Sequence, residues 1–82
     1  MSKIKGWEKI DENKFMIQWA SGKKRVGRNI KVTKNWEKEW KVVEWYGNPS
    51  IPSSPPTLIK IVSSKERARK IANEFMRSHP NG

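Results

Sequence analysis

The segment that most constrains the fold is the C-terminal SSKERARKIANEFMRSHP, residues 63–80. Its apolar residues recur at intervals of three and four and form one stripe of an amphipathic helix, consisting of Ala68, Ile71, Ala72, Phe75 and Met76. Ser63 followed by Glu66 has the spacing of a capping box, and Pro80 ends the helix. A single helix must bury its apolar stripe against another layer of the domain.

Residues 14–34 show the alternation of two β-strands. In KFMIQWA, residues 14–20, aromatic and branched side chains fall on every second position, as is typical of a half-buried strand. The segment RVGRNIKVTK, residues 25–34, alternates in the same way, with Arg28 interrupting its apolar face. The intervening SGKK contains a glycine suited to a turn, so the two segments predict an antiparallel hairpin.

Residues 39–46, EWKVVEWY, predict a third strand, because their apolar residues do not form one helical stripe. Val43 and Trp45 share one face of this strand, and Trp40 and Val42 share the other. A slip of one residue in the register would exchange the two faces. The third strand therefore decides which aromatic rings face solvent.

The remaining segments complete the predicted sheet. Residues 47–57, GNPSIPSSPPT, are rich in proline and predict a loop. A short strand follows in TLIKIV, residues 57–62, and residues 6–10 supply a further candidate strand around Trp7.

These elements predict an α+β fold, with a four-stranded antiparallel sheet and one C-terminal helix packed on one face; a strand at residues 6–10 makes the sheet five-stranded. We expect residues 1–82 to form a single domain. The side chains expected against the helix are Phe15, Ile17, Trp19, Ile30, Val32, Val43, Trp45, Ile59 and Ile61. The opposite face is expected to show Met16, Gln18, Arg25, Asn29, Lys31, Trp40, Val42, Tyr46 and Lys60.

The charge balance narrows the class of partner. Eighteen Lys and Arg residues against eight acidic residues give a net charge of +10. A field of this sign attracts polyanions, so nucleic acid, an anionic membrane or an acidic protein are the partners to consider. The alternative is that the lysines only keep the protein soluble, and abundant Lys and Glu without Cys favour a thermophilic source.

The residue types give little support to catalysis. The chain has no cysteine, and its single histidine, His79, lies at the end of the predicted helix, where capping of the last carbonyls is the simpler role. No cluster has the spacing of metal ligands, and no glycine-rich phosphate loop is present. We therefore expect a protein that is not an enzyme and has no metal or cofactor.

Binding is better supported, because a basic cluster runs through the predicted hairpin and aromatic residues follow it. Flat rings interleaved with cations suit single-stranded DNA or RNA with low sequence specificity: the rings stack on bases while lysines contact phosphates. The helix mixes basic with acidic residues, which argues against duplex recognition. The predicted nucleic-acid-binding residues are Lys23, Lys24, Arg25, Arg28, Lys31, Trp36, Trp40, Tyr46 and Lys60.

Other interpretations of the same residues stay open. Lysines on edge strands also discourage aggregation, and a core this small needs most of the five tryptophans. An open apolar patch also suits a protein-interaction or homodimerisation module. A membrane partner fits poorly, because no apolar run spans a bilayer and the helix stripe is expected on the sheet. MSKIKGWEKI lacks the apolar segment of a signal peptide, so we expect a soluble, cytoplasmic protein.

The order of elements, the positive charge and the A…IA..FM…P pattern of the helix resemble small archaeal proteins of the single-stranded DNA-binding ThermoDBP kind and related sheet-plus-helix proteins. The resemblance covers most of the chain. It implies single-strand binding on a basic, aromatic surface without a cofactor. The candidate site residues given above come from the residue pattern itself and not from this resemblance.

Overall fold

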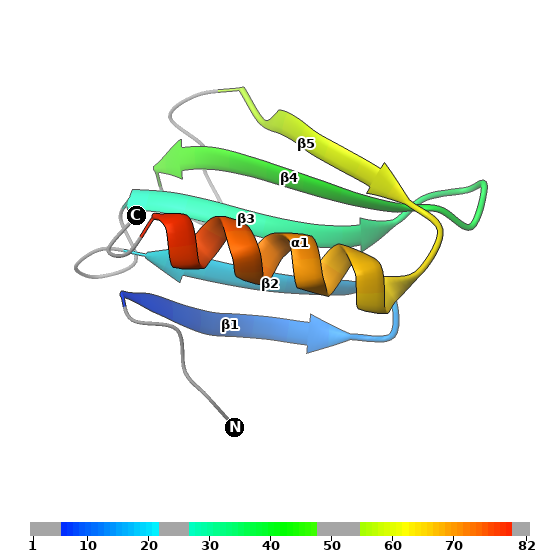
Figure 1. Cartoon of the computed structure of the whole chain (residues 1–82), viewed down its shortest axis with the longest axis horizontal. Helices are drawn as coiled ribbons and strands as arrows, with labels where there is room; N and C mark the ends of the chain where they lie inside the picture. Colours follow the sequence, from blue (N-terminus) through cyan, green and yellow to red (C-terminus); the bar gives the residue numbers. More distant parts are fainter. Residues whose placement is uncertain (1–5, 22–26, 48–54, 80–82) are drawn as a thin grey trace.

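A computed structural model describes residues 6–21, 27–47 and 55–79 of the chain. The elements are β1 (Trp7–Asn13), β2 (Met16–Ser21), β3 (Gly27–Lys34), β4 (Trp40–Gly47), β5 (Thr57–Val62) and α1 (Lys65–Ser78). The five strands form one antiparallel sheet in the order of the sequence, and α1 lies across one face of it (Figure 1). The predicted α+β fold is confirmed, including the additional N-terminal strand.

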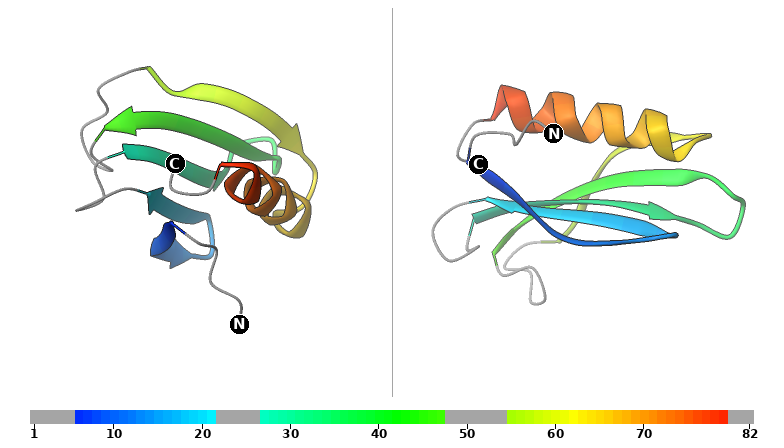
Figure 2. Two further views of the ribbon diagram at one scale, coloured as in Figure 1. Left: turned by 60° about the vertical axis from the view of Figure 1, so that its left-hand side comes forward. Right: turned by 90° about the horizontal axis from the view of Figure 1, so that it is seen from below.

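The helix and the sheet form two layers, seen edge-on in Figure 2. Ile17, Val32 and Val42 lie side by side on β2, β3 and β4 and are fully buried. Ala68 and Ala72 of α1 pack in the same core, where their small side chains allow the helix to approach the sheet closely. Burial of each of the large aliphatic side chains stabilises the fold by about 1.5–3 kcal/mol.

The predicted orientation of β4 was wrong. Trp40 and Val42 belong to the core under α1, whereas Val43 and Trp45 point to the opposite face of the sheet. Both sets are apolar, so alternation alone could not separate them. The observed register places Glu44 on the helix side, where its carboxylate accepts a hydrogen bond from Arg28 at 3.0 Å.

Two further residues were expected against the helix and are not. Phe15 lies in the turn between β1 and β2 and is 60% exposed. Ile61 is 41% exposed, because a register shift opposite Val42 and Val43 breaks the alternation of β5. As a result, Ile59 packs against the core while Ile61 faces outward.

The apolar stripe of α1 is confirmed, but its cap is one residue later than predicted. The Ser64 side chain accepts a hydrogen bond from the Arg67 backbone N–H at 3.2 Å, as an N-cap residue does. Glu66 then occupies the second helical position and not the third, so the Ser63–Glu66 capping box does not form. Its carboxylate still lies in the first turn, where the helix dipole favours a negative charge.

Candidate nucleic-acid interface

We call the sheet face opposite α1 the open face. Residues paired directly across antiparallel strands point to the same face, so the register identifies its side chains. The open face carries Met16, Gln18 and Ala20 of β2, Asn29, Lys31 and Thr33 of β3, Lys41, Val43 and Trp45 of β4, and Leu58 and Ile61 of β5. No described helix covers this face (Figure 2).

Two lysines lie near the middle of the open face. Lys31 of β3 and Lys41 of β4 are half-buried, so their aliphatic stems pack on the sheet while the ammonium groups reach solvent. The acidic residues Glu8 and Asp11 belong to β1, at the edge of the sheet. The cationic part of the open face is therefore over β3 and β4.

The amide side chains expected on this face are not available to a ligand. Asn29 is fully buried, and its Nδ2 donates to the backbone carbonyl oxygens of Gly47 at 2.8 Å and of Gly27 at 3.3 Å. Asn29 therefore ties the end of β4 to the start of β3. Gln18 is also buried.

The turn between β3 and β4 holds Trp36 in a defined position. Asn35 Oδ1 accepts hydrogen bonds from the backbone N–H groups of Glu37 and Glu39, both at 2.9 Å. Lys38 closes the turn with a left-handed backbone, φ 63°, which a non-glycine residue seldom adopts. Trp36 is 100% exposed at the tip. The indole is thus displayed on an ordered turn.

Phe15 is displayed in a similar way at the same end of the sheet. Asn13 Oδ1 accepts a hydrogen bond from the Phe15 N–H at 2.8 Å, and the Phe15 carbonyl oxygen accepts one from the Lys34 N–H at 2.9 Å. The second bond joins the β1–β2 turn to the end of β3. We call this end, with the exposed residues Lys14, Phe15, Lys34, Trp36 and Lys38, the aromatic end.

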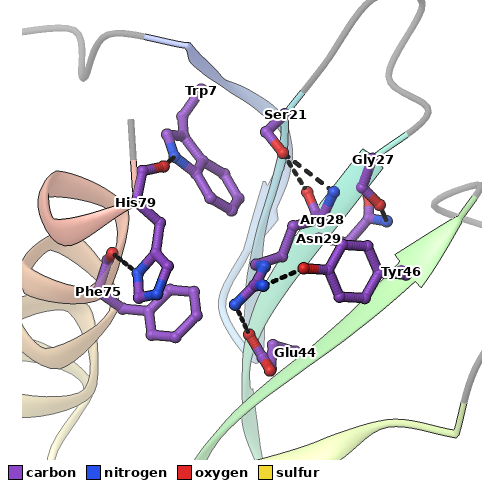
Figure 3. Close-up of polar contacts among 9 residues, drawn as sticks. All are labelled: Trp7, Ser21, Gly27, Arg28, Asn29, Glu44, Tyr46, Phe75 and His79. Atoms are coloured by element: carbon purple, nitrogen blue, oxygen red, sulfur yellow. Dashed lines mark hydrogen bonds and ion pairs between the residues drawn. The ribbon is translucent and has the colours of Figure 1, made fainter. Parts of the chain in front are cut away.

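Arg28 and Tyr46, two predicted site residues, lie on the helix side at the opposite end of the sheet. Arg28 donates to the Glu44 carboxylate at 3.0 Å and to the Tyr46 hydroxyl (Figure 3). Its guanidinium lies 4.6 Å from the centroid of the Tyr46 ring and 5.4 Å from that of Phe75. These contacts hold α1 against β3 and β4. The Arg28 guanidinium therefore already contacts a carboxylate and two aromatic rings of the protein and is not displayed on the open face.

Trp40, predicted as a stacking residue, is buried in the core. Its ring is 7% exposed, and the Lys65 ammonium lies 5.8 Å from its centroid on the helix side. A base cannot reach this indole without displacing α1. The prediction that Trp40 is exposed on the open face was wrong for the same reason as the register of β4.

The other predicted contacts are distributed over different surfaces. Lys60 is exposed on β5, but it pairs with Val42 and so belongs to the helix side of the sheet. Lys23, Lys24 and Arg25 lie outside the described residues. Of the predicted residues that the structure describes, only Lys31, on the open face, and Trp36, at the aromatic end, belong to the candidate surface that these two regions define.

Sequence reasoning missed two members of this surface, Lys41 and Phe15. Lys41 follows from the register, because it alternates with Val43 along β4. Phe15 had a local signal: the preceding Asn13 can form a side-chain turn, which ends the strand before the ring.

Within residues 6–21, 27–47 and 55–79, no group of His, Cys, Asp and Glu is arranged to hold a metal ion. In the same residues, no helix has both the length and the apolar character needed to cross a membrane.

Neither protein-family models, nor curated proteins, nor solved structures gave a match to this chain. The resemblance to single-stranded DNA-binding proteins of the ThermoDBP kind therefore stays a prediction.

Proposed function

We propose that this protein binds single-stranded nucleic acid with low sequence specificity, as a binding protein and not as an enzyme. The observation that carries the proposal is the complete exposure of Trp36 on a turn fixed by Asn35, beside a lysine-bearing sheet face. An exposed indole is unfavourable in water, and a turn whose backbone is already ordered reduces the conformational entropy that is lost when the ring stacks on a base.

The surface supplies the two kinds of contact that single strands require. Unpaired bases stack on aromatic rings, and Trp36 and Phe15 are both exposed at the aromatic end. Phosphates need cations nearby, and Lys41 and Lys31 continue from this end along the open face. We propose that the strand begins at Trp36 and runs over β4 and β3, away from the acidic residues of β1.

Fluorescence titration tests this proposal directly. Trp36 is the one exposed tryptophan, since the other four are at most 9% exposed. A short, unstructured oligonucleotide added at low salt should quench the exposed component of the emission. Trp36→Ala should weaken binding by about 5–150-fold, equivalent to the ~1–3 kcal/mol of one base–ring stack. Trp36→Phe should retain part of the affinity, because it keeps a ring.

Matched lysine variants separate a site from a general charge effect. Lys41→Ala should weaken binding and reduce the log–log salt slope by ~0.7, the value for one phosphate contact with a single strand. Lys70→Ala removes the same charge from an exposed position of α1 and should have a smaller effect. Equal affinities of wild type and Trp36→Ala, or no binding at low salt, would exclude the proposed site. Exposed rings that bind no oligonucleotide would favour a protein-interaction role.

A further inference from the structure

The second edge of the described sheet is formed by β5, which within residues 6–21, 27–47 and 55–79 has a strand neighbour on one side only. The sheet order places β5 last, paired with β4, and no described element lies beyond it in Figure 1. Leu58 is 51% exposed and Ile61 is 41% exposed on this strand. An edge strand with free backbone groups and exposed aliphatic residues is a template for pairing with another strand.

The bulge in β5 gives the strand an unusual symmetry. Leu58 pairs with Val43 and Ile61 pairs with Lys41, so both aliphatic residues point to the open face although they are three apart in sequence. In an unbulged strand, residues three apart would point to opposite faces. The residues on the helix side are Thr57, Ile59, Lys60 and Val62. In β5, the second and the fifth of the six residues point to the open face, and the other four point to the helix side. The pattern of faces is therefore the same whether the strand is followed forwards or backwards.

We propose that β5 pairs antiparallel with β5 of a second copy, around a two-fold axis perpendicular to the sheet between Ile59 and Lys60. In this register, residue numbers of each pair add to a constant, so Leu58 lies opposite the partner subunit's Ile61, and Ile61 opposite the partner subunit's Leu58. Every pair joins residues on the same face, which cross-strand pairing requires. The result is one continuous sheet that extends across both subunits of the dimer.

The symmetry of β5 favours a second copy over an unrelated peptide. A two-fold interface needs a surface that is complementary to itself, and the face pattern of β5 meets this condition. The other edge strand, β1, exposes Glu8, Lys9, Asp11 and Glu12, and charged residues on an edge discourage pairing. The proposed dimer also leaves α1 and the aromatic end of each subunit uncovered, so it does not depend on the proposed function.

The dimer and the nucleic-acid complex should respond to salt in opposite directions. The two copies of Lys60 would approach each other on the helix side, and each subunit carries a net charge of +10. Added salt screens this repulsion and should strengthen the dimer. Binding to phosphates weakens with salt, because counterion release becomes less favourable.

Sedimentation velocity and cysteine cross-linking test the proposal together. We expect a salt-strengthened dimer for the wild type and a monomer for Ile61→Lys, with circular dichroism confirming that both are folded. Because the chain has no cysteine, the variant Leu58→Cys/Ile61→Cys should form a reducible dimer on mild oxidation. Each single variant should not, since the two equivalent positions would be about 10 Å apart, beyond the reach of a disulfide.

The double variant Phe15→Cys/Trp36→Cys, at exposed positions of the aromatic end, controls for cross-linking by random collision. Equal cross-linking of this control and of the β5 variant would overturn the proposal. Efficient cross-linking of either single β5 variant would indicate another register and would also contradict it. A wild type that stays monomeric at high salt, with no cross-link in the double variant, would show that β5 remains a free edge.

Discussion

Trp36 differs from the other tryptophans in the kind of contact that holds it in place. The others lie in the sheet and are buried, whereas Trp36 is positioned only through the backbone of its turn. Its ring therefore contributes little to the core. For this reason Trp36→Ala should change the affinity for a single strand without lowering stability, and the thermal midpoint provides the control for the titration.

At Gly27, the close approach of β2 and β3 leads to a prediction about stability. A Cβ at this position would lie 2.8 Å from the Ser21 backbone oxygen. Ser21 Oγ also bridges the neighbouring residue, donating to the Arg28 carbonyl at 2.8 Å and accepting from its N–H at 3.1 Å. Gly27→Ala should therefore lower the free energy of unfolding by about 1–3 kcal/mol, measured by chemical denaturation. An unchanged midpoint would show that β2 and β3 approach less closely here.

At the scale of elements, β1 is joined to α1 by a group of charges around Glu12. Its carboxylate contacts Lys9 at 2.7 Å and Arg69 at 3.0 Å, with Lys65 at 3.9 Å. A hydrogen bond from Lys9, together with the positive charges of Lys9, Arg69 and Lys65, lowers the pKa of Glu12 from its ordinary value of 4.5. The Trp7 indole adds a second link, donating to the His79 carbonyl at 2.8 Å (Figure 3).

The lowered pKa predicts how stability depends on pH. Because the folded state favours the carboxylate, the contribution of Glu12 is present above pH 4.5 and is lost as the pH falls through the lower folded pKa. At pH 7, Glu12→Gln should be less stable than wild type by about 0.2–1 kcal/mol, the range for solvent-exposed ion pairs. The difference should shrink toward zero in acid. A constant difference in thermal unfolding across this range would contradict the ion-pair explanation.

The element that sequence reasoning oriented wrongly is β4, although it contains the information needed. Arg28 interrupts the apolar face of β3, and a half-buried guanidinium needs a carboxylate partner. The register that puts Glu44 on the helix side supplies one directly beside Arg28, and it brings Trp40 and Val42 into the core. Pairing Arg28 with Glu44 would therefore have corrected the predicted orientation of β4, that is, which of its apolar side chains face the helix. The bulge in β5 had no comparable signal, because it depends on pairing with β4.

For the molecule as a whole, hydrophobic periodicity was sufficient to predict the α+β architecture. The apolar residues of β2 and β3 alternate as in a strand, and those of α1 recur as in a helix, so each element has one clear apolar face. It was insufficient for the candidate site. Exposure of an aromatic residue depends on tertiary register in β4 and on turn geometry at Phe15 and Trp36. The sequence pattern likewise could not show that the charge of Arg28 is already paired, because its partners come from β4 and α1, which are distant in sequence.

The most direct measurement is a two-dimensional nitrogen–proton NMR titration with a short single-stranded oligonucleotide at low salt. The expected result is a shift of the Trp36 indole resonance and of the Lys31 and Lys41 amides, which lie on the open face and the aromatic end. The Trp7 indole, hydrogen-bonded to the His79 carbonyl oxygen at the C-terminal end of α1, should not move. Shifts confined to α1, or an unperturbed Trp36 indole at saturation, would contradict single-strand binding on the open face.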